Sequence, residues 1–103
     1  MYTVIFITCS GKAEASRIGK ALLVKKLAAC ANIIDRVDSL FWWKGRIDRA
    51  KECLLIVKST REKFAGIAAA VRSLHSYETP EIIALPVCRG SKTYLEWIDD
   101  SIG

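Results

Sequence analysis

One short segment, His75-Ser76-Tyr77-Glu78-Thr79-Pro80-Glu81, brings together the only histidine of the chain, a tyrosine and two carboxylates. It falls between two apolar stretches, where packing alone would call for a short polar turn. Binding groups are often carried on connections that a rigid scaffold holds in place. The segment is therefore a candidate ligand or metal site.

A metal site is one chemistry that these residue types could support. We expect His75 and Glu81 as ligands of a divalent ion, with Cys9 as a third candidate, because imidazole, carboxylate and thiolate together suit zinc or copper. A structural role for His75 stays open, since it follows the last apolar residue of a helical stripe and could bind the terminal carbonyls. Glu78 and Glu81 could also form an acid–base pair.

Several other kinds of site are excluded by the motifs. The sequence has no GxSxG nucleophile motif, no P-loop and no dinucleotide fingerprint, so we do not expect an enzyme. Its four cysteines, which include no CxxC pair, argue against a zinc ribbon and an iron–sulfur cluster. Cys30, Cys53 and Cys88 lie in apolar contexts and are expected to be buried reduced thiols.

Composition limits the partners and the location. The net charge is +5 with basic residues scattered along the chain, so no nucleic-acid partner is expected. No apolar run approaches the roughly 20 residues that span a bilayer, and the first strand lacks the flanks of a signal peptide. We therefore expect no membrane partner and a cytoplasmic location.

Hydrophobic periodicity predicts the elements that position these residues. Strands are expected at 2–8, 30–42, 47–58 and 81–87, with a turn at Trp43-Lys44-Gly45 between the middle two. Helices are expected at 12–29, 60–74 and 91–101. Their predicted caps are Ser10 for the first helix, the pair Ser59 and Glu62 for the second, and the pair Thr93 and Glu96 for the third.

The order β-α-β-β-α-β with an added C-terminal helix predicts an α+β, ferredoxin-like sandwich formed by a single domain over residues 1–103. The strands are apolar on both faces, as Val4 and Phe6 alternate with Ile5 and Ile7. Helices can cover only one face of the sheet, so an obligate oligomer is expected. The long hairpin, with Phe41, Trp42 and Trp43, is the arm expected to reach a neighbouring subunit.

The assembled residues resemble the CutA family, the divalent-cation tolerance proteins, over essentially the whole chain. The matching blocks are Ile7-Thr8-Cys9, Leu27-Ala28-Ala29-Cys30-Ala31-Asn32-Ile33, Ser39-Leu40-Phe41-Trp42-Trp43-Lys44-Gly45-Arg46-Ile47, Leu55-Ile56-Val57-Lys58-Ser59-Thr60, His75-Ser76-Tyr77-Glu78-Thr79-Pro80-Glu81-Ile82 and Tyr94-Leu95-Glu96-Trp97. The resemblance implies a tight homotrimer, a role in the response to copper and other divalent cations, and no established reaction.

The chain departs from the copper-associated members of that family at two positions. Where those members carry a cysteine before the strand-end threonine and a second histidine, this sequence has Ile7 and Leu74. His75 therefore remains as the only histidine ligand.

Two rival functions share the same fold class. A trimeric sensor similar to the PII proteins would bind a small anionic metabolite between subunits, and its ligand-binding residues would be Lys58, Tyr77, Glu81 and Trp97, together with Arg61. An acylphosphatase-like enzyme ranks third, because only Ser10-Gly11-Lys12 stands where its glycine-rich phosphate loop would be.

Overall fold

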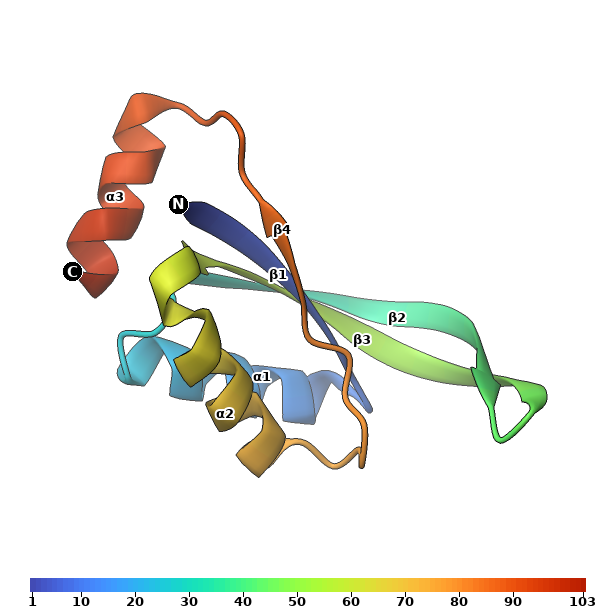
Figure 1. The fold of residues 1–103 in the computed structure, drawn as a ribbon. Coiled ribbons are helices and arrows are strands. Elements are labelled where there is room, and N and C mark those ends of the chain that lie inside the picture. Colours follow the sequence, from blue (N-terminus) through green and yellow to red (C-terminus); the bar gives the residue numbers. More distant parts are fainter.

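The computed structural model describes residues 1–103 and contains one four-stranded antiparallel sheet with α1 and α2 on one face (Figure 1). Its elements are β1 (Tyr2–Cys9), α1 (Lys12–Val24), β2 (Cys30–Trp43), β3 (Arg46–Thr60), the 3-10 turn η1 (Arg61–Lys63), α2 (Phe64–Leu74), β4 (Ile83–Pro86) and α3 (Lys92–Ile102). The strand order is β2-β3-β1-β4. The expected α+β, ferredoxin-like fold with its extra helix is confirmed.

The core lies between the sheet and the two long helices. Alternate residues of β1, namely Ile5, Ile7 and Cys9, are fully buried, and the strand residues between them are only half-buried. Successive side chains of a strand point to opposite faces, so these three residues share the helix-covered side. Because β1 continues as far as Cys9, that cysteine lies on the same face as Ile7.

The opposite face of the sheet and the hairpin keep large apolar side chains in contact with solvent. Trp42 is 72% exposed, Leu40 69%, Ile47 67% and Ile83 53%. Val4 and Phe6 on β1 are half-buried on that face. The apolar character of both faces is therefore present in the structure, and the chain by itself covers only one of them.

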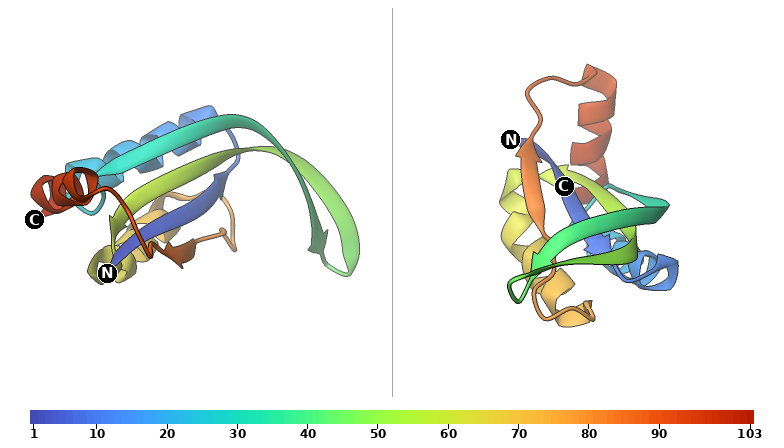
Figure 2. Two further views of the ribbon diagram at one scale, coloured as in Figure 1. Left: turned by 90° about the horizontal axis from the view of Figure 1, so that it is seen from above. Right: turned by 90° about the vertical axis from the view of Figure 1, so that its right-hand side faces the viewer.

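The hairpin formed by β2 and β3 is long and curved (Figure 2). Its two-residue turn, Lys44 and Gly45, has φ values of 51° and 77°, as expected for a type I′ turn that matches the strand twist. The register shifts between Ile34 and Val37, where Arg36 has a φ of 65°. A bulge of this kind bends a strand, and the curved hairpin extends well beyond the two long helices (Figure 2).

Helix α1 ends at Val24 rather than at residue 29, so the predicted length was wrong. Lys26 adopts a φ of 56°, its N–H donates to the Leu23 carbonyl, and the N–H of Leu27 donates to the Leu22 carbonyl. This is the Schellman pattern, which usually has glycine at the left-handed position. A lysine there gave no signal of the helix end.

Two of the predicted caps are replaced by other contacts. Ser10 does not cap α1, because Gly11 takes that position and Ser10 instead donates to the Glu14 carboxylate. Ser59 and Glu62 form no capping box either. β3 runs on to Thr60, and the Ser59 hydroxyl donates to the Leu27 carbonyl at 2.5 Å.

The C-terminal region differs from the prediction in three details. Ser91, not Thr93, caps α3 by accepting the Tyr94 N–H at 3.3 Å. β4 has only four residues, because its pairing with β1 covers Ile83 to Pro86. Cys88 follows this strand and is exposed, whereas Cys53 is buried as expected.

Candidate functional site

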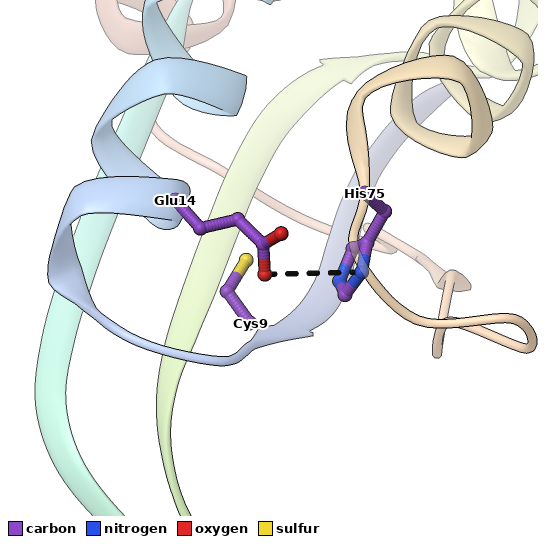
Figure 3. Close-up of side chains that lie close together, drawn as sticks. All are labelled: Cys9, Glu14 and His75. Carbon is purple, nitrogen blue, oxygen red and sulfur yellow. Dashed lines mark ion pairs between the residues drawn. The ribbon is translucent and has the colours of Figure 1, made fainter.

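Three metal-ligating side chains meet where β1 ends. Donor atoms of Cys9, Glu14 and His75 all lie within 4.8 Å of one another (Figure 3). Cys9 is the last residue of β1, Glu14 lies in the first turn of α1 and His75 caps the end of α2. The fold therefore brings together two of the predicted ligands, Cys9 and His75, with a carboxylate that the sequence analysis did not select.

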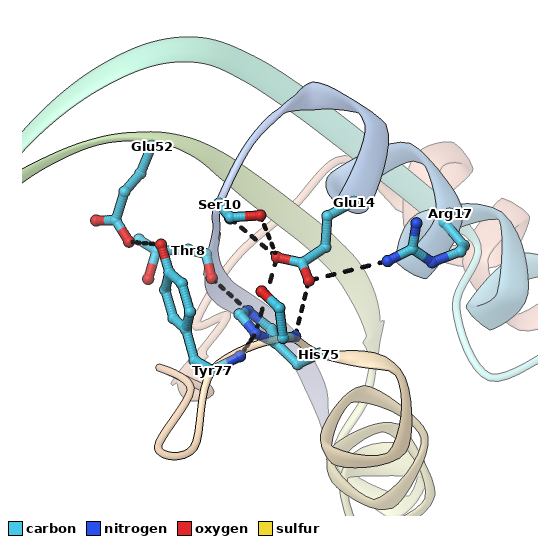
Figure 4. Close-up of polar contacts among 8 residues, drawn as sticks. Thr8, Ser10, Glu14, Arg17, Glu52, His75 and Tyr77 are labelled. Atoms are coloured by element: carbon cyan, nitrogen blue, oxygen red, sulfur yellow. Dashed lines mark hydrogen bonds and ion pairs between the residues drawn. The ribbon is translucent and has the colours of Figure 1, made fainter.

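Both ring nitrogens of His75 are held by the main chain, and its side chain is fully buried (Figure 4). The N–H of Tyr77 donates to Nδ1 at 3.0 Å, so Nδ1 accepts and carries no proton. Nε2 lies 2.7 Å from the Thr8 carbonyl oxygen and therefore donates its proton to it. In this tautomer the 3.8 Å contact between Nδ1 and Glu14 does not join opposite charges.

Glu14 is a buried carboxylate surrounded by donors. The N–H and hydroxyl of Ser10 donate to Oε1 at 2.9 and 3.0 Å, and the N–H of Ser76 donates to Oε2 at 2.8 Å. The exposed Arg17 lies 3.9 Å away. Burial by itself raises the pKa of this carboxyl, but the hydrogen bonds from Ser10 and Ser76 outweigh it and lower the pKa to about 2.

Cys9 has the opposite electrostatic environment. Burial, followed by the negative charge of Glu14, raises the pKa of its thiol to about 12. The thiolate is the form that attacks electrophiles and binds metals. Cys9 is therefore held as a thiol, and the cluster does not contain an activated nucleophile.

The donor types of this cluster fit a thiophilic divalent ion, but the donors are already engaged. An ion would have to release the proton of Cys9 and replace one of the two hydrogen bonds of His75. Ligands of bound metals must be deprotonated. The arrangement can hold such an ion only in competition with the contacts that now connect β1, α1 and the segment after α2.

A second feature is a hollow of about 750 Å³ beneath the curved hairpin. Its lining consists of Thr8, Ser39, Leu40, Phe41, Trp42, Trp43, Asp48, Arg49, Ala50, Glu52, Tyr77, Glu78, Thr79 and Glu81. The Tyr77 hydroxyl donates to Oε2 of Glu52 at 2.8 Å, and burial together with this carboxylate raises the pKa of Tyr77. Burial and the charge of Glu52 also raise the pKa of Glu81.

The remaining predicted ligand residues lie apart from one another in the single chain. Tyr77 and Glu81 share the hollow, and Glu81 is not part of the Cys9–Glu14–His75 cluster. Lys58 pairs with Val4 nearer the other end of β1, and its ammonium donates to the Asn32 side chain. Trp97 is 45% exposed on α3, with its ring centroid 5.4 Å from that of Tyr94. The Arg61 N–H donates to the Met1 carbonyl.

Two acidic residues at these sites were missed from the sequence. Glu14 follows the helix-capping Gly11 by three residues, a spacing at which a glutamate reaches back to main-chain N–H groups, and this was an available signal. Glu52 precedes the apolar part of β3 and had no such signal.

None of the helices combines the length and the apolar character that a membrane-spanning helix needs.

Comparison with known proteins points to one family. The family of the CutA1 divalent ion tolerance protein matches residues 3–101. The divalent-cation tolerance protein CutA of Archaeoglobus fulgidus is 49% identical over 99% of both chains, and that of Thermus thermophilus is 39% identical over 100% of both. The solved structure of the periplasmic divalent cation tolerance protein CutA from Archaeoglobus fulgidus covers 100% of both chains at a TM-score of 0.97 and 48% identity. These relatives are named for tolerance and not for a reaction.

Proposed function

The chain belongs to the CutA1 divalent ion tolerance family, and from that premise we propose that it is a homotrimer that binds a divalent metal ion, with copper(II) as the first ion to test. One observation carries the metal part of the proposal. Cys9, Glu14 and His75 present thiol, carboxylate and imidazole donors within 4.8 Å of one another. Thiolate and imidazole donors favour zinc and copper over magnesium and calcium.

The state of these donors predicts how binding depends on pH. A metal ion must displace the Cys9 proton, and the pKa of that thiol is raised to about 12. Below this value, apparent affinity should rise about tenfold for each unit of pH, provided that one proton is released. Such a strong dependence would set this site apart from binding by exposed carboxylates, which are already ionised at neutral pH.

The test is a titration of chelator-stripped protein with copper(II), and with cobalt(II) to detect thiolate coordination by its charge-transfer absorption. The variants Cys9→Ser and His75→Gln should lose saturable binding and the thiolate band. Cys88→Ser is the matched control, because Cys88 is exposed and lies outside the cluster. Thermal unfolding gives an independent reading, since an ion bound to the native state must stabilise it.

The metal proposal fails under two outcomes. Binding that Cys9→Ser and His75→Gln leave unchanged would place the ion elsewhere. A complete lack of stabilisation at saturating metal would show that the native state holds no ion, and His75 would then serve only the main-chain contacts described above.

The trimer is supported by the uncovered apolar surface. The exposed Leu40, Trp42 and Ile47 lie on the hairpin, and Ile83 is exposed on β4, so the far face and the arm can be buried only by another surface. Trp42→Asp should lower the assembly mass measured by light scattering, whereas Lys44→Asp in the turn should not. An unassembled wild-type chain at micromolar concentration would refute the trimer.

The anionic-metabolite sensor gains no support from the hollow. Its lining contains Asp48, Glu52, Glu78 and Glu81 against the single cation Arg49, so its field repels an anion.

We propose a cytoplasmic location on the ground of four unpaired cysteines, since disulfides are rare in reducing compartments. Fractionation of cells with an antibody to the protein would test this location.

A further inference from the structure

The layer formed by α1 and α2 carries an excess of exposed positive charge. Its exposed bases are Lys12, Arg17, Lys20, Lys25, Lys26, Arg61 and Arg72. Glu62 is the only exposed acid of the layer, because Glu14 is buried. Both helices cover the same face of the sheet (Figure 1), so this layer lies opposite the apolar face that the trimer would bury. The basic residues are scattered along the sequence, and the fold gathers them on one side of the subunit.

The C-terminal end of α1 carries the densest part of this charge. Lys20, Lys25 and Lys26 are exposed, and no carboxylate oxygen lies within 4.0 Å of their ammonium groups. Lys26 also adopts a φ of 56°, where glycine is usual, so a charged side chain is kept here at a cost in backbone strain. Three like charges without a protein partner favour the approach of an anionic surface.

Two large apolar side chains are exposed among these lysines. Val24 is 73% exposed and Leu23 40%. They follow Lys20 by three and four residues, so the three side chains are neighbours on the helix surface. The helix dipole accounts for lysines at the C-terminal end of a helix, but not for exposed apolar side chains between them. We call Lys20, Leu23, Val24, Lys25 and Lys26 the α1 tip.

The composition of the α1 tip is typical of a surface that binds an anionic bilayer. Lysines close to a membrane are attracted by anionic headgroups, and apolar side chains beside them can enter the boundary between headgroups and acyl chains. A nucleic acid offers phosphates to the lysines, but its backbone would leave Leu23 and Val24 in water. The paired charge and apolar surface therefore favour a lipid partner.

We infer that the α1 tip docks the protein on an anionic membrane surface, with the three lysines at the headgroups and Leu23 and Val24 beneath them. Docking of this kind is peripheral and needs no membrane-spanning helix. The α1 tip shares no residue with the Cys9–Glu14–His75 cluster, and its partner is not a metal ion. This inference and the proposed function can therefore fail independently.

The experiment is co-sedimentation of the intact, assembled protein with lipid vesicles at physiological ionic strength, in the presence of a chelator. Vesicles of phosphatidylcholine mixed with phosphatidylserine are compared with vesicles of phosphatidylcholine alone. Lys20→Gln and Lys25→Gln remove charge, and Lys26→Asn does so with a residue that tolerates a positive φ. Val24→Ser removes apolar surface and leaves the charge unchanged. Lys92→Gln is the matched control, because it removes the same charge from α3, outside the helix layer.

We expect saturable binding to the anionic vesicles alone. Each lysine variant of the α1 tip should weaken it by about fivefold, the factor that corresponds to about 1 kcal/mol for a basic side chain near an anionic surface. Val24→Ser should also weaken binding, whereas Lys92→Gln should bind as the wild type does. Circular dichroism establishes that each variant is folded before it is measured.

Three results would each overturn the inference: no binding to anionic vesicles, equal binding to neutral vesicles, or α1-tip variants that all bind as Lys92→Gln does. A mixed-sequence DNA duplex tests the other polyanion in the same assay conditions. Duplex binding that the lysine variants weaken and Val24→Ser does not, without binding to vesicles, would assign the α1 tip to nucleic acid and would also overturn it.

Discussion

Replacing Glu14 with glutamine should remove an acid-sensitive part of the protein's stability. The carboxylate accepts hydrogen bonds from Ser10 and Ser76 and so connects α1 to the segment after α2. Glutamine has one acceptor oxygen, and its amide would face a main-chain N–H. The substitution should therefore destabilise the folded state at neutral pH, where Glu14 is ionised.

The magnitude and the sign follow from the pKa of this group, which falls from 4.5 to about 2 on folding. At about 1.4 kcal/mol for each pH unit the change corresponds to roughly 3 kcal/mol, and we expect about 2 after screening by nearby solvent. Because the folded pKa is the lower one, this contribution is complete above about pH 4.5 and disappears as the pH falls toward 2.

The free energy of unfolding is measured by urea unfolding at a fixed protein concentration, followed by circular dichroism at several pH values across this window. The wild type should be more stable than Glu14→Gln by about 2 kcal/mol near neutral pH, and the difference should shrink toward zero as the pH falls to 2. Glu62→Gln, an exposed control, should show little difference at any pH. A gap between wild type and Glu14→Gln that stays constant across the window would refute the hydrogen-bonded carboxylate.

Three further substitutions test local features by urea unfolding. Tyr77→Phe leaves the buried Glu52 without its donor and should cost about 1–3 kcal/mol; no loss would mean that solvent already satisfies the carboxylate. Lys26→Gly should stabilise by up to about 1 kcal/mol because of its φ of 56°, whereas Lys25→Gly, at a φ of −81°, should destabilise; equal effects would contradict the helix end described. Gly45→Ala should lower the free energy of unfolding by about 1 kcal/mol through backbone strain alone, since no atom lies within 4 Å of the added Cβ.

The architecture could be predicted from the sequence because its signals are periodic and local. Alternation in β1 and the stripe of α2 define the faces that pack together, and the order of the elements then limits the topology to few choices. The element ends were harder to predict. The end of α1 is closed by local hydrogen bonds, but a lysine occupies the left-handed position where glycine is usual, so the sequence did not mark it. The Ser59 hydroxyl instead donates to the carbonyl of Leu27, a tertiary contact that no local pattern contains.

The candidate site could be predicted only in part for the same reason. The segment from His75 to Glu81 was selected from the sequence as chemically unusual, and its residues lie at two separate places in the structure. His75 points toward Cys9 and Glu14, while Tyr77 and Glu81 line the hollow. The sequence places these residues within seven positions and does not reveal which side of the turn each one faces. That division follows from the strands that each residue contacts, since His75 binds the Thr8 carbonyl on β1 and Tyr77 binds Glu52 on β3.

The two places also differ in what they offer to a ligand. At the cluster, His75 and Glu14 already bind main-chain groups from three segments, so an incoming metal must replace contacts that hold the fold together. In the hollow, Glu52 accepts the Tyr77 hydroxyl, and no buried side-chain oxygen or nitrogen of the chain lacks a hydrogen-bond partner. Because displaced hydrogen bonds subtract from affinity, metal binding at the cluster should be weak and strongly dependent on pH.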